Sequence, residues 1–447
     1  MASLEESQHD LEDSRSDVVI AGAGVIGTAI AWRAALRGLS VTVVDPGWGD
    51  AATEVAAGML APVSESVFGE NDLLALNLLA VARFPGFVAE LEQATGLVTG
   101  LRAEGTLVVA FDKGDHDRLR RLTAFRHERG LQATALDAGA CRELEPFLAP
   151  GVHGGVLAVG DLSVDNRRYA AALRAAAATA GVRFVRAAVT DVAAVDGVVT
   201  DGGVVPARRV VLAAGWRTGQ IGGLPGYLRS AFRPVKGQIL RLRHPGGMPP
   251  VLTRTVRAIV KGTDVYLVPR ADGEIVVGAT QDERDDLDVT AGAVHDLLHD
   301  AMSVLPVISE LTLAEARAAL RPGSADNGPV VGEVAQGILV ACGHFRNGIM
   351  LSAATADEVA GLLAGDPPAA EWKPFTPDRL YSPGGTTPLS TPRLKGDAGG
   401  TTPLSTPRLK GDPPLIPPLA GEPAQTAGPR DIPAAGLGTI AMEGPPA

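Results

Sequence analysis

The sequence predicts an α/β protein in which a discontinuous, Rossmann-like nucleotide-binding domain is interrupted by an antiparallel-sheet domain. Over residues 17–45, an apolar strand runs into a glycine turn, a helix and a second strand that ends in an acid. A second strand–glycine–helix unit covers residues 338–364. Between them, short strands separated by turn residues cluster at 234–278. The nucleotide-binding domain is therefore expected to be split around the inserted sheet.

The N-terminal unit carries three glycines in the GxGxxG spacing directly after its first strand. Gly22 allows a tight turn, Gly24 lets the backbone approach a pyrophosphate, and Gly27 lets the helix pack closely on the sheet. The helix N-terminus offers unpaired N–H groups to phosphates. Asp45 ends the second strand, where an acid can accept the ribose hydroxyls. The unit predicts NAD or FAD without choosing between them; a glycine turn without a ligand is the alternative.

Composition excludes several classes of function. The chain has 447 residues, enough for two or three domains. A net charge of −11 argues against nucleic acid or an anionic membrane as the main partner. No apolar run approaches the roughly 18 residues of a spanning helix, and residues 1–16 do not resemble a secretion signal. Cys141 and Cys342 are too few for a disulfide framework or a metal cage, so we expect reduced thiols, no metal and a cytoplasmic location.

Hydrophobic periodicity and turn residues predict the remaining elements. Helices are predicted at 28–37, 73–94, 116–129, 164–180, 294–305 and 349–364, the fourth with a capping residue at its start. Strands are predicted at 18–21, 41–44, 106–111, 156–159, 182–189, 197–205, 209–215, 234–243, 257–260, 264–269, 274–278 and 338–342. Residues 47–62 and 320–332 are predicted as loops, and the small residues of the first suggest backbone packed against a flat ligand.

The C-terminal part of the sequence changes character from about residue 376. The segment 384–397 recurs without change as 399–412. Proline and glycine make up about 36% of the last 72 residues, above the roughly 25–30% that marks low complexity. We predict a disordered, non-catalytic tail, with a docking segment for a partner that binds polyproline helices as the alternative.

Several spaced motifs point to one family. They are AAGML at 56–60, PVKG at 234–237, YLVPR at 266–270, VGAT at 277–280, LRPG at 320–323 and GHFRNGI at 343–349. With these motifs, residues 17–372 resemble the glycine oxidases of the thiamine pathway, in the D-amino acid oxidase group of FAD-dependent amine oxidases. The implied FAD-binding domain covers 17–85, 150–225 and 325–373, and the substrate domain covers 86–149 and 226–324. Tails at 1–16 and 374–447 are expected to be disordered.

The resemblance implies which residues bind the flavin. Residues 57–59 would lie along the flavin ring, Val189 would read the adenine through its backbone, and residues 344–350 would lie under the pyrimidine end. The complete predicted set is Gly22, Gly24, Val25, Ile26, Gly27, Asp45, Pro46, Ala52, Thr53, Ala57, Gly58, Met59, Val189, His344, Phe345, Arg346, Asn347, Gly348, Ile349 and Met350. The sequence lacks the tethering cysteine of sarcosine oxidases near LRPG, so a non-covalent flavin is expected.

The resemblance also implies three substrate-binding residues. Arg321 matches the arginine that binds the substrate carboxylate, Tyr266 a pocket tyrosine, and Arg346 a second pocket arginine. Arginine suits this task because its guanidinium binds a carboxylate through two parallel hydrogen bonds. Without the motif, a surface position for Arg321 is the alternative. Gln281 and Asp264 depart from the family pattern, and we expect both to influence side-chain preference.

The implied reaction is oxidation of glycine, or of small amines such as sarcosine or D-alanine, to an imine that hydrolyses to an oxo acid and ammonia. Oxygen is reduced to hydrogen peroxide, and the imine supplies thiazole synthesis. Hydride transfer from a neutral amine needs no general base, so we assign no catalytic acid or base, His344 included. The alternatives are a D-amino acid or sarcosine oxidase or dehydrogenase of the same fold, and a non-catalytic flavin-binding partner protein. A homo-oligomer is expected from the resemblance.

Overall fold

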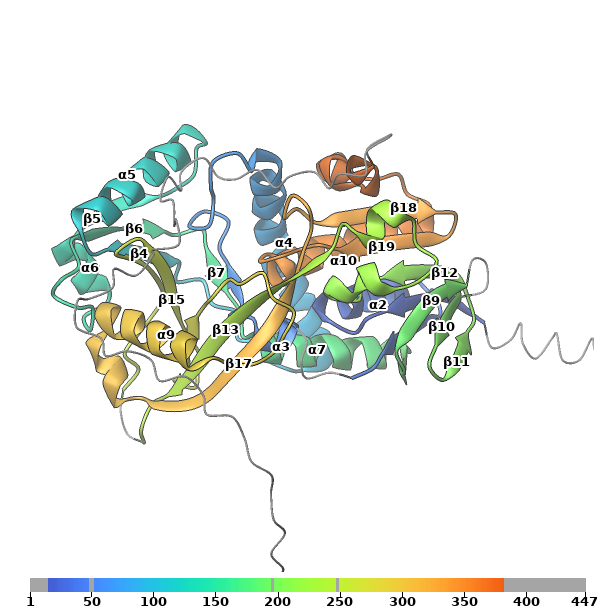
Figure 1. Cartoon of the computed structure of the whole chain (residues 1–447), viewed down its shortest axis with the longest axis horizontal. Coiled ribbons are helices and arrows are strands. Elements are labelled where there is room, and N and C mark those ends of the chain that lie inside the picture. The colour runs from blue at the N-terminus through green and yellow to red at the C-terminus, as the bar shows by residue number, and fades with distance from the viewer. Residues whose placement is uncertain (1–14, 48–51, 194–196, 247–248, 382–447) are drawn as a thin grey trace, which may run out of the picture. The chain divides into compact units, whose positions relative to one another are not determined.

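The computed structural model describes residues 15–47, 52–193, 197–246 and 249–381 (Figure 1). The 14-residue repeat and almost all of both predicted tails lie outside these residues. Two large sheets organise the described chain, one in the nucleotide-binding domain and one in the inserted domain. The predicted class, α/β with an inserted sheet domain, is confirmed.

The sheet of the nucleotide-binding domain has six strands. Their order is β18 (Val330–Ala335), β19 (Ile338–Cys342), β12 (Ala207–Leu212), β1 (Ser16–Ala21), β2 (Val41–Asp45) and β8 (Arg183–Arg186). All neighbours are parallel except β18, which runs antiparallel to β19. Because β1 is central, its side chains are buried on both faces. This explains its continuous apolar run in the sequence.

Helices cover one face of this sheet and a small sheet covers the other. The helices are α2 (Val25–Leu36), α4 (Asn71–Thr95), α7 (Asn166–Thr179) and α10 (Gly348–Ala364), and they share one apolar core with Val18 and Ile20 of β1. On the other face, Val19 packs towards the three-stranded sheet of β9 (Val189–Ala193), β10 (Gly197–Thr200) and β11 (Gly203–Val205). The side chain of Asp165 caps α7 by accepting from two backbone N–H groups, as predicted.

The inserted domain contains an eight-stranded sheet. Its order is β17 (Thr312–Gly323), β13 (Arg233–Arg243), β16 (Ile275–Gly278), β15 (Thr263–Pro269), β14 (Thr255–Val260), β4 (Thr106–Ala110), β6 (Gly154–Ala158) and β5 (Thr134–Asp137). Neighbours are antiparallel except β4 and β14, which are parallel. The sheet is therefore mixed at this one pair, which joins two segments far apart in the chain.

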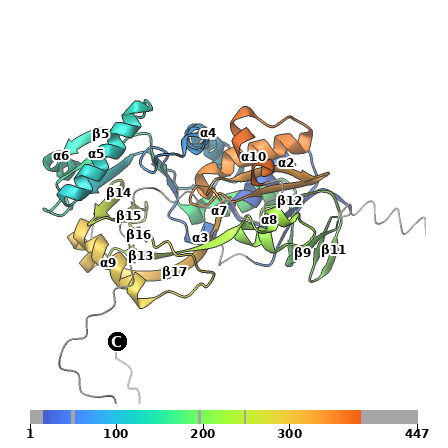
Figure 2. The same cartoon turned by 45° about the horizontal axis from the view of Figure 1, so that its top comes forward.

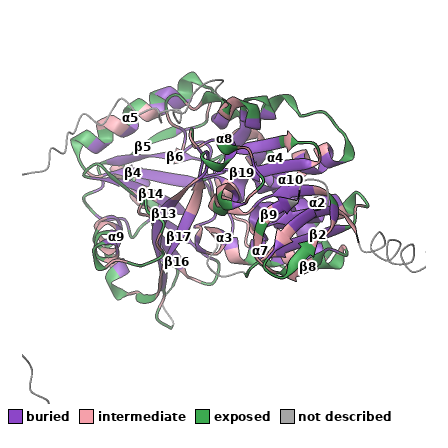
Figure 3. Cartoon of the chain, turned by 45° about the vertical axis from the view of Figure 1, so that its right-hand side comes forward, coloured by how far each residue is buried: buried purple, intermediate pink, exposed green. Residues whose placement is uncertain are grey.

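Helices cover the two faces of this second sheet. Leu107 and Val109 of β4 share a core with α9 (Ala291–Val304) and Cys141 of α6 (Ala138–Leu144), whereas Val108 packs with Leu119 of α5 (Lys113–Glu128). The alternation follows from the two-residue period of a strand. Figure 2 shows α5 and α9 on opposite sides of the sheet. Exposed residues lie along the outer sides of both helices in Figure 3.

Two elements lie across or beside the predicted domain boundaries. The boundary at 85/86 falls inside α4, whose Phe87 and Leu91 extend the apolar stripe of the helix into the nucleotide-domain core. Just after the boundary at 149/150, residues 154–158 form β6 and pair with β4 in the eight-stranded sheet. The residues of each predicted tail that adjoin the folded domains form regular structure. Ser16 begins β1, and the short helices η3 (Ala370–Phe375) and η4 (Pro377–Leu380) continue past residue 374.

Three predictions of secondary structure are wrong. The strand predicted at 197–205 is a hairpin, because β10 and β11 pair antiparallel across a turn at 201–202. The strand predicted at 182–189 is two strands in different sheets, β8 and β9, with the chain turning between them. The loop predicted at 320–332 begins as the end of β17 and finishes as the start of β18, because both segments pair with neighbouring strands. The remaining short elements are α3 (Ala52–Val55), β3 (Met59–Leu60), β7 (Leu162–Ser163), η1 (Gly215–Gln220), α8 (Gly226–Arg229) and η2 (Pro306–Glu310).

Helix α4 corrects a further expectation. Its 25 residues are long and apolar enough to cross a membrane by length and composition alone. In the structure, its side chains Leu76, Phe84 and Leu91 are fully buried in the core that it shares with α7 and α10. The hydropathy of α4 is accounted for by its position as a core helix.

Candidate active site

One large cavity connects the two domains. It has a volume of about 920 Å³ and reaches from the glycine turn after β1 to the sheet of the inserted domain. Gly22, Gly24 and Asp45 line one end, and Tyr266 and Arg321 line the other. The carboxyl ends of β1 and β2 open into it, where ligands of open parallel sheets bind.

At the nucleotide end, the glycines have distinct roles. Gly22 has φ +108°, and a Cβ there would lie 2.4 Å from the carbonyl oxygen of Ala213. A Cβ on Gly24 would make only an ordinary contact, 3.5 Å from Thr53 Oγ1. Packing within the protein therefore does not require glycine at 24. Its missing side chain instead leaves the N-terminus of α2 open to the cavity, as an approaching pyrophosphate requires.

Polar side chains hold this end in shape. Asp45 accepts hydrogen bonds from the backbone N–H groups of Ala23 and Gly47, each at 2.8 Å. Thr53 Oγ1 accepts from the N–H of Val25 at 3.0 Å. Gly24 itself has no side chain to cap α2, so apart from the Val25–Thr53 bond the positive end of the helix faces the cavity. These residues fit the diphosphate and ribose of a dinucleotide.

Residues 57–59 also line the cavity. Gly58 has φ +72°, and a Cβ there would lie 2.0 Å from the carbonyl oxygen of Val164. Arg270 is buried and donates to the carbonyl oxygens of Ala57 at 2.7 Å and Val164 at 3.1 Å. Burial lowers the pKa of Arg270 to about 10, so it remains a cation at neutral pH. The sequence marked both this segment and the motif YLVPR that ends in Arg270, but not the contact between them.

At the substrate end, Arg321 extends from β17 into the cavity. Its Nη1 donates to the carbonyl oxygens of Thr280 at 3.1 Å and Lys236 at 3.3 Å. A Cβ on Gly237 would lie 2.4 Å from the same nitrogen, so this glycine provides the space for the guanidinium. Burial lowers the pKa of Arg321, but a guanidinium starts high enough to stay charged at neutral pH. The cavity therefore contains a fixed cation with N–H groups left to bind a ligand.

Tyr266 lines the same end of the cavity from β15. A Cβ on Gly278, its partner across the β15–β16 pair, would lie 2.3 Å from Tyr266 Oη. Burial raises the pKa of Tyr266, so the phenol keeps its proton and can donate a hydrogen bond. The glycines of PVKG and VGAT thus make room for the two side chains predicted to bind substrate.

The loop between β19 and α10 completes the cavity wall. His344 is 1% exposed, its Nε2 lies 3.0 Å from Thr355 Oγ1, and burial lowers its pKa to about 3. Cys342 donates to the carbonyl oxygen of Gly215 at 2.9 Å, and burial raises its pKa to about 12. At neutral pH the imidazole is uncharged and the thiol is protonated. Neither group suits proton abstraction or nucleophilic attack.

The structure brings most of the predicted site residues to this cavity. Those lining it are Gly22, Gly24, Val25, Ile26, Asp45, Pro46, Ala52, Thr53, Ala57, Gly58, Met59, Val189, Tyr266, Arg321, His344, Phe345, Arg346, Gly348 and Ile349. Three predicted residues do not line it. Gly27 packs behind the turn, where a Cβ would lie 1.9 Å from Gly22 O, and Met350 is buried in the nucleotide-domain core. Asn347 lines a smaller neighbouring pocket.

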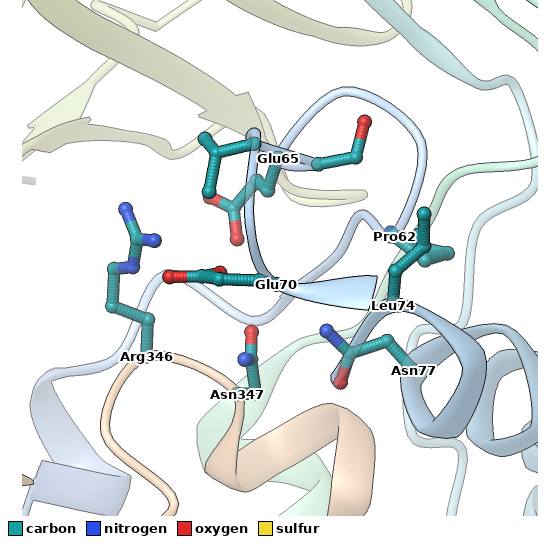
Figure 4. Close-up of a pocket in the computed structure, with 9 residues that line it drawn as sticks. Pro62, Glu65, Glu70, Leu74, Asn77, Arg346 and Asn347 are labelled. Atoms are coloured by element: carbon teal, nitrogen blue, oxygen red, sulfur yellow. The ribbon is translucent and has the colours of Figure 1, made fainter. Parts of the chain in front are cut away.

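That smaller pocket shares Arg346 and Glu65 with the large cavity (Figure 4). Glu65 was not predicted as a site residue; its only signal in the sequence is a carboxylate shortly after AAGML.

Asp264 and Gln281, the two residues that depart from the family pattern, lie outside this site. Asp264 forms an ion pair with Arg118 at 2.8 Å, and neither Asp264 nor Gln281 lines the cavity. The expectation that they shape side-chain preference is not supported, since both are exposed.

Comparison with known proteins identifies the family. Residues 17–362 match the family described as FAD dependent oxidoreductase. The chain belongs to this family. The oxidoreductase is 35% identical over 371 residues to a glycine oxidase from Geobacillus kaustophilus, covering 81% of this chain and 96% of that protein. The crystal structure of a glycine oxidase from the same organism has a TM-score of 0.75, with 34% identity and coverage of 81% and 98%.

A second relative is longer than this oxidoreductase. It is a bifunctional protein ThiO/ThiG from Synechocystis, 33% identical over 378 residues, covering 82% of this chain. The chain spans about half of that relative, 54% of its length. FAD is the cofactor of the family, so the dinucleotide predicted from the glycine turn is FAD.

Proposed function

We propose that this FAD-dependent oxidoreductase oxidises glycine, and small amines such as sarcosine or D-alanine, to an imine that hydrolyses to an oxo acid and an amine, which is ammonia for glycine and D-alanine and methylamine for sarcosine. Electrons pass to oxygen, which is released as hydrogen peroxide, and the imine supplies thiazole synthesis for thiamine. The observation that carries the proposal is the pairing of Arg321 with Tyr266 at one end of a cavity whose other end is built for a dinucleotide. The relatives named glycine oxidase and ThiO support the choice of substrate.

The residues at the nucleotide end would hold FAD. Gly22 and Gly24 give the backbone access, α2 directs its positive end at the diphosphate, and Asp45 offers oxygen atoms to the ribose. When bound, FAD accepts two electrons from the substrate and passes them to oxygen. We propose that it is held without a covalent bond, because the thiol of Cys342 is protonated and engaged with Gly215. Acid precipitation of the protein is expected to release all of the flavin into the supernatant.

The residues at the substrate end would orient the amino acid. Arg321 binds the carboxylate through two parallel hydrogen bonds, and Tyr266 donates a third. Fixing the carboxylate at one end of the cavity sets the position of the substrate Cα, and this positioning is the contribution of the protein to the rate. We assign no catalytic acid or base, because His344 is buried and uncharged and the amine can bind in its neutral form.

Stopped-flow spectroscopy tests the proposal and separates its alternatives. Anaerobic glycine is expected to bleach the flavin absorbance, and oxygen is expected to restore it rapidly. Slow restoration by oxygen with fast restoration by an artificial acceptor would indicate a dehydrogenase. The absence of bleaching by any small amine would indicate a flavin-binding protein without turnover.

The cellular setting is part of the same proposal. A cytoplasmic location agrees with the two cysteines, Cys141 and Cys342, which are both free and buried. A homo-oligomer is proposed from the family resemblance, and light scattering of the purified chain measures it directly.

A further inference from the structure

The wall of the substrate end contains a carboxylate that the proposed reaction does not use. Glu65 lies in the segment between β3 and α4, and its side chain lines both the large cavity and the smaller pocket beside it. Figure 4 shows Glu65 and Glu70 on the same side of the pocket, with Arg346 opposite. A negative charge at this place is unexpected in a site that must attract a carboxylate.

Buried charges fix the backbone on both sides of Glu65. Asp161, which is fully buried, accepts from the N–H groups of Val63 at 2.9 Å and Ser64 at 3.2 Å. Arg126, 1% exposed, donates to the carbonyl oxygen of Ser64 at 2.6 Å and to Ser66 Oγ at 3.3 Å. The segment is therefore tied to α5 and to the turn after β6, so the backbone at Glu65 cannot shift without breaking these bonds.

The side chain of Glu65 is also held. Arg257 of β14 forms an ion pair with it, and both side chains are about one-sixth exposed. Arg257 stands directly opposite Tyr266 in the β14–β15 register, so the pair lies beside the residues proposed to bind substrate. The negative charge of Glu65 acts on both Tyr266 and Arg321 by favouring the protonated form of each, although burial lowers the pKa of Arg321 overall. The opposite charges of Glu65 and Arg257 thus partly neutralise each other beside the residues proposed to bind substrate.

We propose that Glu65 is a specificity-determining residue that excludes substrates with a second acidic group, while Arg257 limits its repulsion of the first. A substrate with one carboxylate places it on Arg321 and directs only its small amine end towards Glu65. A second carboxylate would have to lie against Glu65 in a cavity that screens charge poorly. Glu70 acts in the same sense, because it points towards Arg346 and reduces the attraction of that guanidinium for a second anion (Figure 4).

The test uses the FAD-loaded enzyme with acetate and malonate as probes, one with a single carboxylate and one with two. Dissociation constants come from the change in flavin absorbance, which needs no turnover. The quantity compared is the preference for malonate, the dissociation constant of acetate divided by that of malonate. Glu65→Gln leaves Arg257 unpaired and is expected to raise this ratio at least tenfold. Arg257→Met leaves Glu65 unpaired and is expected to lower this ratio at least threefold. The double variant is expected to return the ratio to within threefold of the wild type.

The outcomes separate specificity from structure. Glu90→Gln, which breaks the surface ion pair with Arg33, is the matched control and is expected to leave the ratio unchanged. A merely structural role for Glu65 would weaken both probes equally, and a ratio that stays within twofold in Glu65→Gln would overturn the proposal. The inference rests on the proposed function for its substrate site. If the ratio responds but no amine is oxidised, the proposed function fails alone; if glycine is oxidised and the ratio does not respond, this inference fails alone.

Discussion

At the scale of single residues, the site depends on side chains that are missing as much as on those that are present. Gly237 and Gly278 leave the volume that the Arg321 guanidinium and the Tyr266 ring occupy. Gly24 leaves the end of α2 open. In the sequence these glycines stand inside the motifs PVKG, VGAT and GxGxxG, but only the structure shows which side chain or ligand each one accommodates.

We predict that Arg321→Ala raises the KM for glycine at least 100-fold while FAD stays bound. The reason is the loss of a charge-assisted, bidentate contact to the carboxylate, worth roughly 3 kcal/mol. Steady-state kinetics and the ratio of flavin to protein absorbance measure the two effects. Arg321→Lys, which keeps the charge but not the fork, is the matched comparison and should recover part of the loss. Unchanged kinetics in Arg321→Ala would remove this residue from the carboxylate site.

The sequence identified the residues that belong to motifs and missed those that act through distant partners. Gly22, Asp45, Tyr266 and Arg321 were predicted and line the cavity. Glu65 was not predicted, and Arg270 was named only as the end of the motif YLVPR, because their roles depend on contacts with Arg257 and with the backbone of Ala57. Such contacts join segments nearly 200 residues or more apart, so no local pattern announces them.

At the scale of elements, strand pairing decides where the substrate residues lie. The chain at 320–323 was predicted as the start of a loop. In the structure, Arg321 instead pairs with Val235 along β13, within a strand that continues to Gly323. A strand holds a side chain more precisely than a loop does, which suits a residue that must orient a substrate.

We predict that Gly237→Ala impairs substrate binding with little effect on the fold. The new methyl group would lie 2.4 Å from Arg321 Nη1 and force the guanidinium to move. The KM for glycine should rise at least tenfold, and the melting temperature should change by only a few degrees. Gly292→Ala, at a position with no heavy atom within 4 Å of the new Cβ, is the control. Equal kinetics for the two variants would show that the guanidinium tolerates displacement.

Asp161, which binds the backbone of the segment that carries Glu65, makes the free energy of unfolding depend on pH. Burial raises the pKa of Asp161 to about 6, so the folded protein holds this proton more tightly than the unfolded chain. Its stabilising contribution is full below about pH 4 and is lost as the pH rises through 6, a change of about 3 kcal/mol. We predict that Asp161→Asn removes this part of the pH dependence of the free energy of unfolding.

Urea unfolding of the FAD-loaded protein between pH 4.5 and 7.5 measures the effect of Asp161→Asn. Asp296→Asn serves as the control, because that side chain is 75% exposed. A pH dependence shared by the wild type and Asp161→Asn would show that this carboxyl does not titrate in the range.

At the scale of the whole molecule, the site exists only because two separate sheets open into one cavity. The nucleotide-binding domain contributes the glycine turn, Asp45 and the loop before α10, and the inserted domain contributes Tyr266 and Arg321. The sequence predicted this division and the return of the chain to the first domain. The predicted boundaries pass through α4 and just before β6, because the membership of a helix or strand is set by its packing partners rather than by its own pattern.

A peroxide-coupled assay of the purified, FAD-loaded chain tests the central claim most directly. Glycine, sarcosine and D-alanine are supplied separately in air, and hydrogen peroxide, ammonia and the oxo acid are measured together. We predict turnover of glycine with the three products in equal amounts, and its loss in Arg321→Ala at low glycine concentration. Flavin-replete protein that forms no peroxide from any of these amines would contradict an oxidase of small amino acids.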